Sequence, residues 1–218
     1  MKGRKRTATE ALLFLNTLDS GGLAAGAILS ALLILSGVRY LALLLVFFVL
    51  AAVFTKLGSK RKGNHRPRGW RNVLANGIFP TFAAVVGSPQ LFVGALSAVT
   101  ADKLAGEIGQ LSDRKPILIT DWETQVPRGT NGGITLLGES SAVLAGSVIG
   151  AVSFVLLGRF APPLYLFAGV VSGFLGANFD SILGAVFENR GLLDKHGVNF
   201  LASVFGGIVS LAIFRFFL

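Results

Sequence analysis

Residues 132–157 read GGITLLGESSAVLAGSVIGAVSFVLL, and Glu139 is the one charged residue among them. A helix needs about 17–25 mainly apolar residues to cross the hydrocarbon core of a bilayer. Runs of this kind fill most of the chain, and we expect seven spans, at 21–36, 39–57, 72–86, 90–109, 132–157, 162–187 and 197–217. The sequence therefore predicts an all-α, polytopic helical bundle in a membrane, with six or eight crossings as open alternatives.

The composition supports this fold class. Hydrophobic residues make up 52% of the 218 residues and charged residues only 14%, which is far from the balance of soluble domains. We expect a single membrane domain over residues 1–218. The chain has no cysteine, which excludes disulfides and thiolate metal ligands.

Lysine and arginine gather in alternate connections, and such residues stay on the cytoplasmic side of a membrane. With the N-terminus inside, the inner segments are the basic tail and interfacial helix at 1–20, the basic loop at 58–71, the loop at 110–131 and the connection with Arg190 and Lys195. The acidic residues do not enter this rule, yet they lie in or near the inner ends of the predicted helices. We therefore expect a cytoplasmic site in the cell membrane of a prokaryote or archaeon.

The loop at 58–71, GSKRKGNHRPRGWR, carries much of the net charge of +9. Such a loop is typical of contact with anionic lipid headgroups, and we expect membrane lipids as partners. A second interpretation is that some of these cations hold a polyphosphate over the inner face. No aromatic residues are interleaved with the basic stripe in the way a nucleic-acid surface needs, so we expect no nucleic-acid partner.

The fourth predicted helix ends in ADKLAGEIG, at residues 101–109, and its small residues surround a carboxylate. Asp102, Ala105, Gly106 and Gly109 follow the i, i+3, i+4, i+7 spacing of one helical face. Small residues also pack helices tightly in membranes. Asp102 and Glu107 are stronger evidence of a site, because ionisable groups at membrane depth are costly. Two acids without thiol or imidazole partners suit Mg²⁺.

A glycine-rich turn, PRGTNGG at residues 127–133, stands directly before an apolar run. Glycine permits the turns in which consecutive backbone N–H groups point to one anion, and a helix N-terminus adds its dipole. The turn lacks the Gly-Lys-Ser/Thr ending of a Walker A motif. Glycine-rich turns precede many helices, so phosphate binding is one of two interpretations.

Further polar groups lie near the inner helix ends: Asp180 and Ser181 in the sixth predicted span, Glu139 in the fifth and Asn199 in the seventh. Each of them could instead be a buried polar group that hydrogen-bonds between helices. Their common position on the cytoplasmic side favours one shared site.

Together these segments resemble the integral membrane family of plant phytyl-phosphate kinase and animal transmembrane protein 19, and more distantly the polyprenol and dolichol kinases. The segments that carry the resemblance are VLANG at 73–77, ADKLAGEIG at 101–109, RGTNGGITLLG at 128–138, DSILGA at 180–185 and Val198-Asn199. The resemblance extends over nearly the whole chain.

This resemblance implies a kinase that moves a phosphoryl group from a nucleoside triphosphate, such as CTP, to an isoprenoid monophosphate such as phytyl or geranylgeranyl phosphate. It implies Mg²⁺, with Asp102, Glu107 and Asp180 as its ligands. The implied phosphate-binding residues are Lys115, Arg128, Gly129, Thr130, Asn131, Gly132 and Gly133. Further site residues are Asn76, Gly109, Glu139, Ser181 and Asn199. A cytidylyltransferase that forms CDP-lipids, a small transporter and a homodimer remain open.

Overall fold

The computed structural model describes residues 18–62, 67–158 and 161–218. The described residues form a helical bundle with a small sheet. The α-helices are α2 (Ser20–Ser36), α3 (Val38–Lys62), α4 (Trp70–Val85), α5 (Pro89–Gly109), α6 (Leu136–Leu157), α7 (Pro162–Leu183) and α8 (Lys195–Phe217). A π-helical turn, η1 (Gly184–Glu188), continues α7. The expected interfacial helix lies almost entirely outside the described residues.

Each of the seven apolar runs is a helix, as the sequence predicts. In the described part of the chain, four helical segments are long and apolar enough to cross a membrane: Val38–Lys56, Leu136–Leu157, Pro162–Glu188 and Lys195–Phe217. Ser20–Ser36 is apolar but shorter. The number of crossings and the side of the N-terminus therefore stay predictions. The third run continues as one helix through the buried Pro80.

The predicted start of the fifth span, at residue 132, is wrong by four residues. Gly132 has a positive φ of 80°, so it does not lie in a right-handed α-helix. Gly133 and Ile134 then pair with a strand, and α6 begins only at Leu136, after Thr135 has capped it. The residues before α6 are apolar, so hydropathy alone does not separate this strand from the helix.

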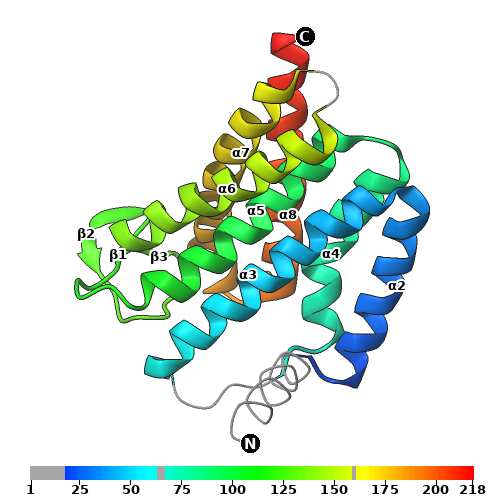
Figure 1. Cartoon of the computed structure of the whole chain (residues 1–218). Helices are drawn as coiled ribbons and strands as arrows, with labels where there is room; N and C mark the ends of the chain where they lie inside the picture. Colours follow the sequence, from blue (N-terminus) through cyan, green and yellow to red (C-terminus); the bar gives the residue numbers. More distant parts are fainter. Residues whose placement is uncertain (1–17, 63–66, 159–160) are drawn as a thin grey trace, which may run out of the picture.

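Helix α5 lies at the centre of the bundle (Figure 1), and α3, α4, α6, α7 and α8 all pack against it. Its residues from Phe92 to Ala101 are buried. Helix α2 covers α4 and part of α3. Small residues let the central helices approach closely, because a Cβ at Gly94 would overlap the backbone of Gly206 in α8.

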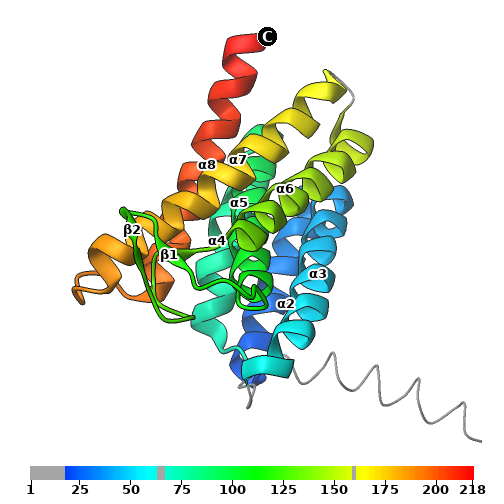
Figure 2. The same cartoon turned by 90° about the vertical axis from the view of Figure 1, so that its left-hand side faces the viewer.

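The predicted loop at 110–131 and the first residues after it contain strands that the sequence did not reveal. Strands β1 (Ile117–Leu118), β2 (Asp121–Gln125) and β3 (Gly133–Ile134) form an antiparallel sheet in the order β2-β1-β3. The sheet lies beside the end of the bundle where α5 finishes and α6 starts (Figure 2). We call this end of the molecule the sheet end.

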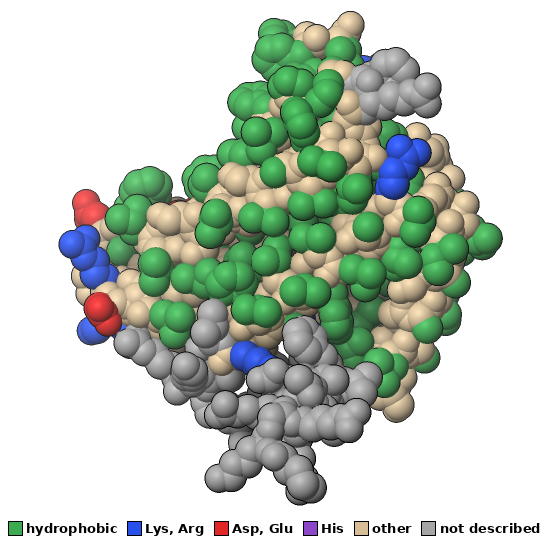
Figure 3. Space-filling model, in the orientation of Figure 1, with side chains coloured by type: hydrophobic (Ala, Val, Ile, Leu, Met, Phe, Trp, Pro, Cys, Tyr) green, Lys and Arg blue, Asp and Glu red, His purple; other side chains and the backbone are tan. Residues whose placement is uncertain are grey.

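The surface of the bundle is mostly apolar (Figure 3). Many large apolar side chains are exposed, among them Leu35 at 85% and Val155 at 75%, and extensive apolar exposure marks a surface that contacts a membrane or another protein. Charged side chains in the same view gather beside the sheet. This pattern fits a bundle surrounded by lipid, with the sheet end at the membrane surface.

Candidate active site

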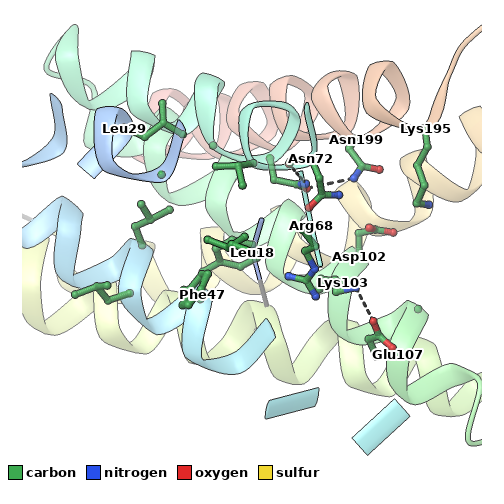
Figure 4. Close-up of a pocket in the computed structure, with 18 of the residues that line it drawn as sticks. Leu18, Leu29, Phe47, Arg68, Asn72, Asp102, Lys103, Glu107, Lys195 and Asn199 are labelled. Atoms are coloured by element: carbon green, nitrogen blue, oxygen red, sulfur yellow. Dashed lines mark hydrogen bonds and ion pairs between the residues drawn. The ribbon is translucent and has the colours of Figure 1, made fainter. Parts of the chain in front are cut away.

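The larger of two neighbouring cavities has a volume of about 600 Å³ and lies between α2, α3, α4 and α5. Figure 4 shows its two chemical halves, with Leu29 and Phe47 on one side and Arg68 and Asp102 on the other. The apolar half is lined by Leu23, Ala27, Leu29, Leu44, Leu45, Phe47 and Phe48. The polar half is lined by Arg68, Asn72, Asn76, Asp102, Lys103, Glu107, Gln110, Lys195 and Asn199. Such a cavity suits an amphiphile with an ionic head.

The smaller cavity, of about 150 Å³, lies between the glycine-rich turn, α5, the start of α6 and the end of α7. Its wall contains most of the residues that the sequence singles out for the site. They are Asp102, Gly109, Gly129, Thr130, Asn131, Gly132, Gly133, Glu139, Asp180 and Ser181.

Both cavities share part of their walls, so they meet at one place. The residues common to both are Asp102, Gly106, Gln110, Gly129, Asn131 and Lys195. Asp102 is the only carboxylate in this shared set. A group bound in one cavity would therefore meet a group bound in the other beside Asp102.

Asp180 reaches this junction from α7 and is almost completely buried. The charged groups that act on it are Asp102, Lys195 and Glu188. Lys195, at the start of α8, lies near three carboxylates, those of Asp102, Asp180 and Glu188. Turned about its amide, Asn199 lies 3.2 Å from Asp180 Oδ2. Two adjacent carboxylates beside one ammonium group form the charged centre of the site.

Glu107 faces the larger cavity and has different partners. Its Oε1 lies 2.5 Å from Lys103 Nζ and accepts a hydrogen bond of 3.2 Å from Thr55 Oγ1. Arg68 Nη2 in turn donates to Thr55 Oγ1 at 2.5 Å. Burial lowers the pKa of the Arg68 guanidinium from its usual value, and the nearby Glu107 carboxylate partly opposes this shift. Glu107 thus joins two cations at the polar end of the larger cavity.

Two glycines of the glycine-rich turn adopt a backbone conformation that favours glycine. Gly129 and Gly132 have positive φ angles of 86° and 80°. A Cβ at Gly132 would lie only 2.5 Å from the Cβ of Ala185, so close packing against η1 also requires glycine there. Asn189 Nδ2 donates to the Asn131 carbonyl at 3.2 Å. The turn is therefore held in place by the end of α7 and η1.

Helix α6 begins at the wall of the smaller cavity. Thr135 caps it, with Oγ1 accepting from Gly138 N at 3.0 Å. A Cβ at Gly109 would lie 3.0 Å from that hydroxyl, so Gly109 lets α5 approach the start of α6. A helix N-terminus is favourable for an anion, because its free N–H groups and its dipole point outward.

Two predicted phosphate-binding residues of the described chain, Lys115 and Arg128, line neither cavity. Arg128 Nη2 donates to the Ser112 carbonyl at 2.5 Å and so stays within the connection. Glu139 lines the smaller cavity and accepts from Asn178 Nδ2 at 2.8 Å, which links α6 to α7. Asn76 lines the larger cavity, and its side-chain amide lies 3.3 Å from the side-chain amide of Asn199.

Comparison with known proteins shows the family of the chain. The family model described as integral membrane protein DUF92 matches residues 8–207. The chain belongs to this family. An uncharacterized membrane protein of Methanocaldococcus jannaschii is 34% identical, and the match covers 90% of this chain and 86% of that protein.

Two plant proteins are also similar to this DUF92 chain. Protein PGR of Arabidopsis thaliana is 28% identical, with 91% of both chains covered. The chloroplastic protein VTE6 of the same plant is 27% identical, over 94% of this chain and 68% of its own. No solved structure matches the chain. The family that the sequence resembles is therefore confirmed.

The described residues of this DUF92 protein contain no group of three or more His, Asp or Glu side chains able to hold a metal. Asp102 and Asp180 are nevertheless adjacent, while Glu107 is paired with Lys103. Mg²⁺ usually takes one or two carboxylates, with waters and substrate phosphates completing its shell. The pair Asp102 and Asp180 fits that pattern, so Mg²⁺ suits this junction in the presence of a phosphorylated ligand.

Several cavity residues were absent from the predicted site: Arg68, Asn72, Lys103, Gln110, Glu188 and Lys195. Lys103 had a visible signal, because its spacing of four from Glu107 places both on one helical face. Arg68 lies in the basic loop at 58–71, for which the sequence left polyphosphate binding as a second interpretation, and Lys195 had only its basic character, which orientation already explained. Their place at the site depends on tertiary contacts.

Proposed function

We propose that this protein transfers a phosphoryl group from a nucleoside triphosphate, CTP or a similar one, to an isoprenoid monophosphate in the membrane. One observation carries the proposal: an amphiphilic cavity and a glycine-walled cavity meet beside Asp102. A lipid kinase needs such a meeting point, because its two substrates approach from different phases. Similarity to the chloroplastic VTE6 and the family resemblance to phytyl-phosphate kinase support the same chemistry.

The smaller cavity would receive the triphosphate. The turn from Gly129 to Gly133 and the N-terminus of α6 line this cavity, and glycine-rich turns and helix N-termini are favourable places for phosphate groups. The cavity holds about 150 Å³, enough for part of a triphosphate and too little for a whole nucleotide. The base and ribose would therefore extend toward the membrane surface.

The larger cavity would hold the isoprenoid monophosphate. Its chain would lie against α2 and α3, and its phosphate at the polar end near Asp102. The acceptor oxygen of a phosphate monoester is already largely ionised near neutral pH, since its second pKa is about 6. No protein base is needed to remove a proton from it.

In the reaction, an oxygen of the acceptor phosphate forms a bond to the γ-phosphorus, and the bond between that phosphorus and the β–γ bridging oxygen breaks. The lipid diphosphate and the nucleoside diphosphate leave. Asp102 and Asp180 would hold Mg²⁺, which supplies charge neutralisation on the phosphates when bound. Lys195 lies beside both carboxylates and would neutralise further charge there.

The test uses purified protein in detergent with Mg²⁺, geranylgeranyl monophosphate and CTP or ATP labelled at either the α- or γ-phosphate. Label transferred to lipid from the γ position alone supports the kinase. Label from the α position with release of pyrophosphate identifies a cytidylyltransferase instead, and no labelled lipid with either nucleotide favours transport.

Asp102→Asn is the variant for this assay, and Asp121→Asn is its matched control. Asp121 is an exposed carboxylate in β2 and lines neither cavity. We expect the first variant to lose labelled lipid and the second to retain it. Equal activity of both variants would contradict the assignment of Asp102.

A further inference from the structure

The polar end of the larger cavity carries two cations that the sequence did not single out as site residues. Arg68 comes from the connection before α4, and Lys103 follows Asp102 on α5. In Figure 4 both side chains lie on the same side of the cavity as Asp102. Neither cation belongs to the glycine-rich turn, to which the triphosphate is assigned.

The backbone and side chain of Arg68 are both fixed. Asp19 N donates to the Arg68 carbonyl at 3.1 Å, which ties this connection to the start of α2. The guanidinium donates to Thr55 Oγ1 on α3. One residue therefore links three elements that surround the cavity, and its charge is held at the cavity wall.

Arg68 and Lys103 also lie close enough to repel each other. Glu107 is the carboxylate between them, through its ion pair with Lys103 and its hydrogen bond with Thr55. Asp102 is a second carboxylate close to Lys103, so the two cations face two carboxylates. The Arg68 guanidinium has five N–H donors, and its hydrogen bond to Thr55 goes to a neutral hydroxyl, so donors remain for an anion in the cavity.

We propose that Arg68 and Lys103 bind the phosphate of a lipid monoester, with its chain lying along the apolar wall formed by α2 and α3. Glu107 is then a positioning residue that holds the two cations. This inference rests on the proposed function, because it assigns the acceptor's head to one end of the same site. It also names a ligand class: a single-chain lipid ending in a phosphate monoester.

Charge distinguishes this ligand from other membrane lipids. A phosphate monoester carries about 1.5–2 negative charges near pH 7, whereas a phosphodiester headgroup has one phosphate charge and a lipid alcohol has none. Arg68 presents a planar fork and Lys103 a point charge, so both can contact one phosphate group. Lys103 is the neighbour of Asp102, which places the bound phosphate at the junction of the cavities.

The test measures binding of tritiated geranylgeranyl monophosphate and of geranylgeraniol to the full chain in detergent, without nucleotide or Mg²⁺. The variants are Arg68→Gln and Lys103→Met. Arg71→Gln is the matched control, because Arg71 is exposed, lies over the Trp70 ring and lines neither cavity. We expect each cavity variant to bind the monophosphate at least tenfold more weakly and the alcohol unchanged.

Unchanged affinity for the monophosphate in both cavity variants would overturn the inference. So would displacement of the lipid by equimolar inorganic phosphate, since that would make the site one for free phosphate. If Arg68→Gln fails to fold, Arg68→Lys keeps the charge and is expected to bind the monophosphate more tightly than Lys103→Met.

This measurement is separate from catalysis. Loss of binding in the variants together with no phosphoryl transfer by the wild type would leave the lipid site standing and refute the kinase. Phosphoryl transfer by the wild type together with normal binding by both variants would refute the lipid site alone. The role of Glu107 has its own readout. Glu107→Gln should bind the monophosphate more tightly than wild type, because the phosphate takes the place of the removed charge, whereas Lys103→Met should bind it more weakly.

Discussion

Replacement of Glu107 by glutamine tests how the two cations are held. The substitution keeps an oxygen that accepts from Thr55 and removes only the charge, so Lys103 loses its ion-pair partner and Arg68 loses a nearby negative charge. Breaking a buried ion pair from one side costs about 3–5 kcal/mol. The Lys103 side chain retains 30% exposure against 5% for Glu107, so we expect the lower part of that range, about 3 kcal/mol.

For a chain of this size, each kcal/mol shifts Tm by roughly 2–4 °C. The expected loss in Glu107→Gln is therefore about 6–12 °C, measured by thermal unfolding in detergent at a fixed scan rate. Geranylgeranyl monophosphate should restore most of this loss, because its phosphate replaces the missing negative charge. The double variant Lys103→Met/Glu107→Gln should unfold close to the wild-type Tm without ligand.

Two results would refute this reasoning. If Glu107→Gln unfolds within 2 °C of wild type, roughly the shift of half a kcal/mol to one, the charge of Glu107 does not hold the cations. If the monophosphate raises Tm equally in wild type and variant, it does not take the place of that charge.

Three further predictions concern packing, chain length and the metal. Gly94→Ala should destabilise the protein by about 1–3 kcal/mol, because the added Cβ overlaps Gly206, while Gly106→Ala, where no atom lies within 4 Å, should unfold near the wild-type Tm. Gly26 lines the larger cavity with open space around it, so Gly26→Leu should lower turnover of a 20-carbon acceptor more than of a 10-carbon one; equal loss would contradict chain binding there. Mg²⁺ with a non-hydrolysable triphosphate should raise Tm in wild type and not in Asp180→Asn, and an equal rise in both would exclude Asp180 as a ligand.

The helices could be predicted because membrane spans depend mainly on the length of apolar runs. The carboxylates of Asp102 and Asp180 could also be expected to meet, since both occupy the same predicted end of neighbouring helices. Strand β3 could not be separated from α6, because Gly133 and Ile134 are as apolar as the helix that follows. Its identity depends on pairing with β1, which is a tertiary contact.

Grouping Glu107 with Asp102 as metal ligands overlooked the geometry of a helix. Five residues at about 100° each place the two side chains roughly 140° apart around the axis. Glu107 accordingly faces Lys103 and Thr55, while Asp102 faces α7. Helical phase could have indicated this separation. The sequence left polyphosphate binding open for the basic loop at 58–71 but could not single out Arg68, because the place of that side chain depends on how the connection before α4 folds against α2 and α3.

The central claim is that lipid and nucleotide occupy different cavities that meet beside Asp102. The most direct measurement is photo-crosslinking of the purified protein, with one probe carrying a photoreactive group at the far end of an isoprenyl monophosphate and another carrying it on the γ-phosphate of a triphosphate. We expect the lipid probe to label α2 and α3, and the triphosphate probe to label residues 129–135 and the start of α6. Labelling of the same peptides by both probes, or lipid labelling confined to the outer surface of α6 and α7, would contradict the account.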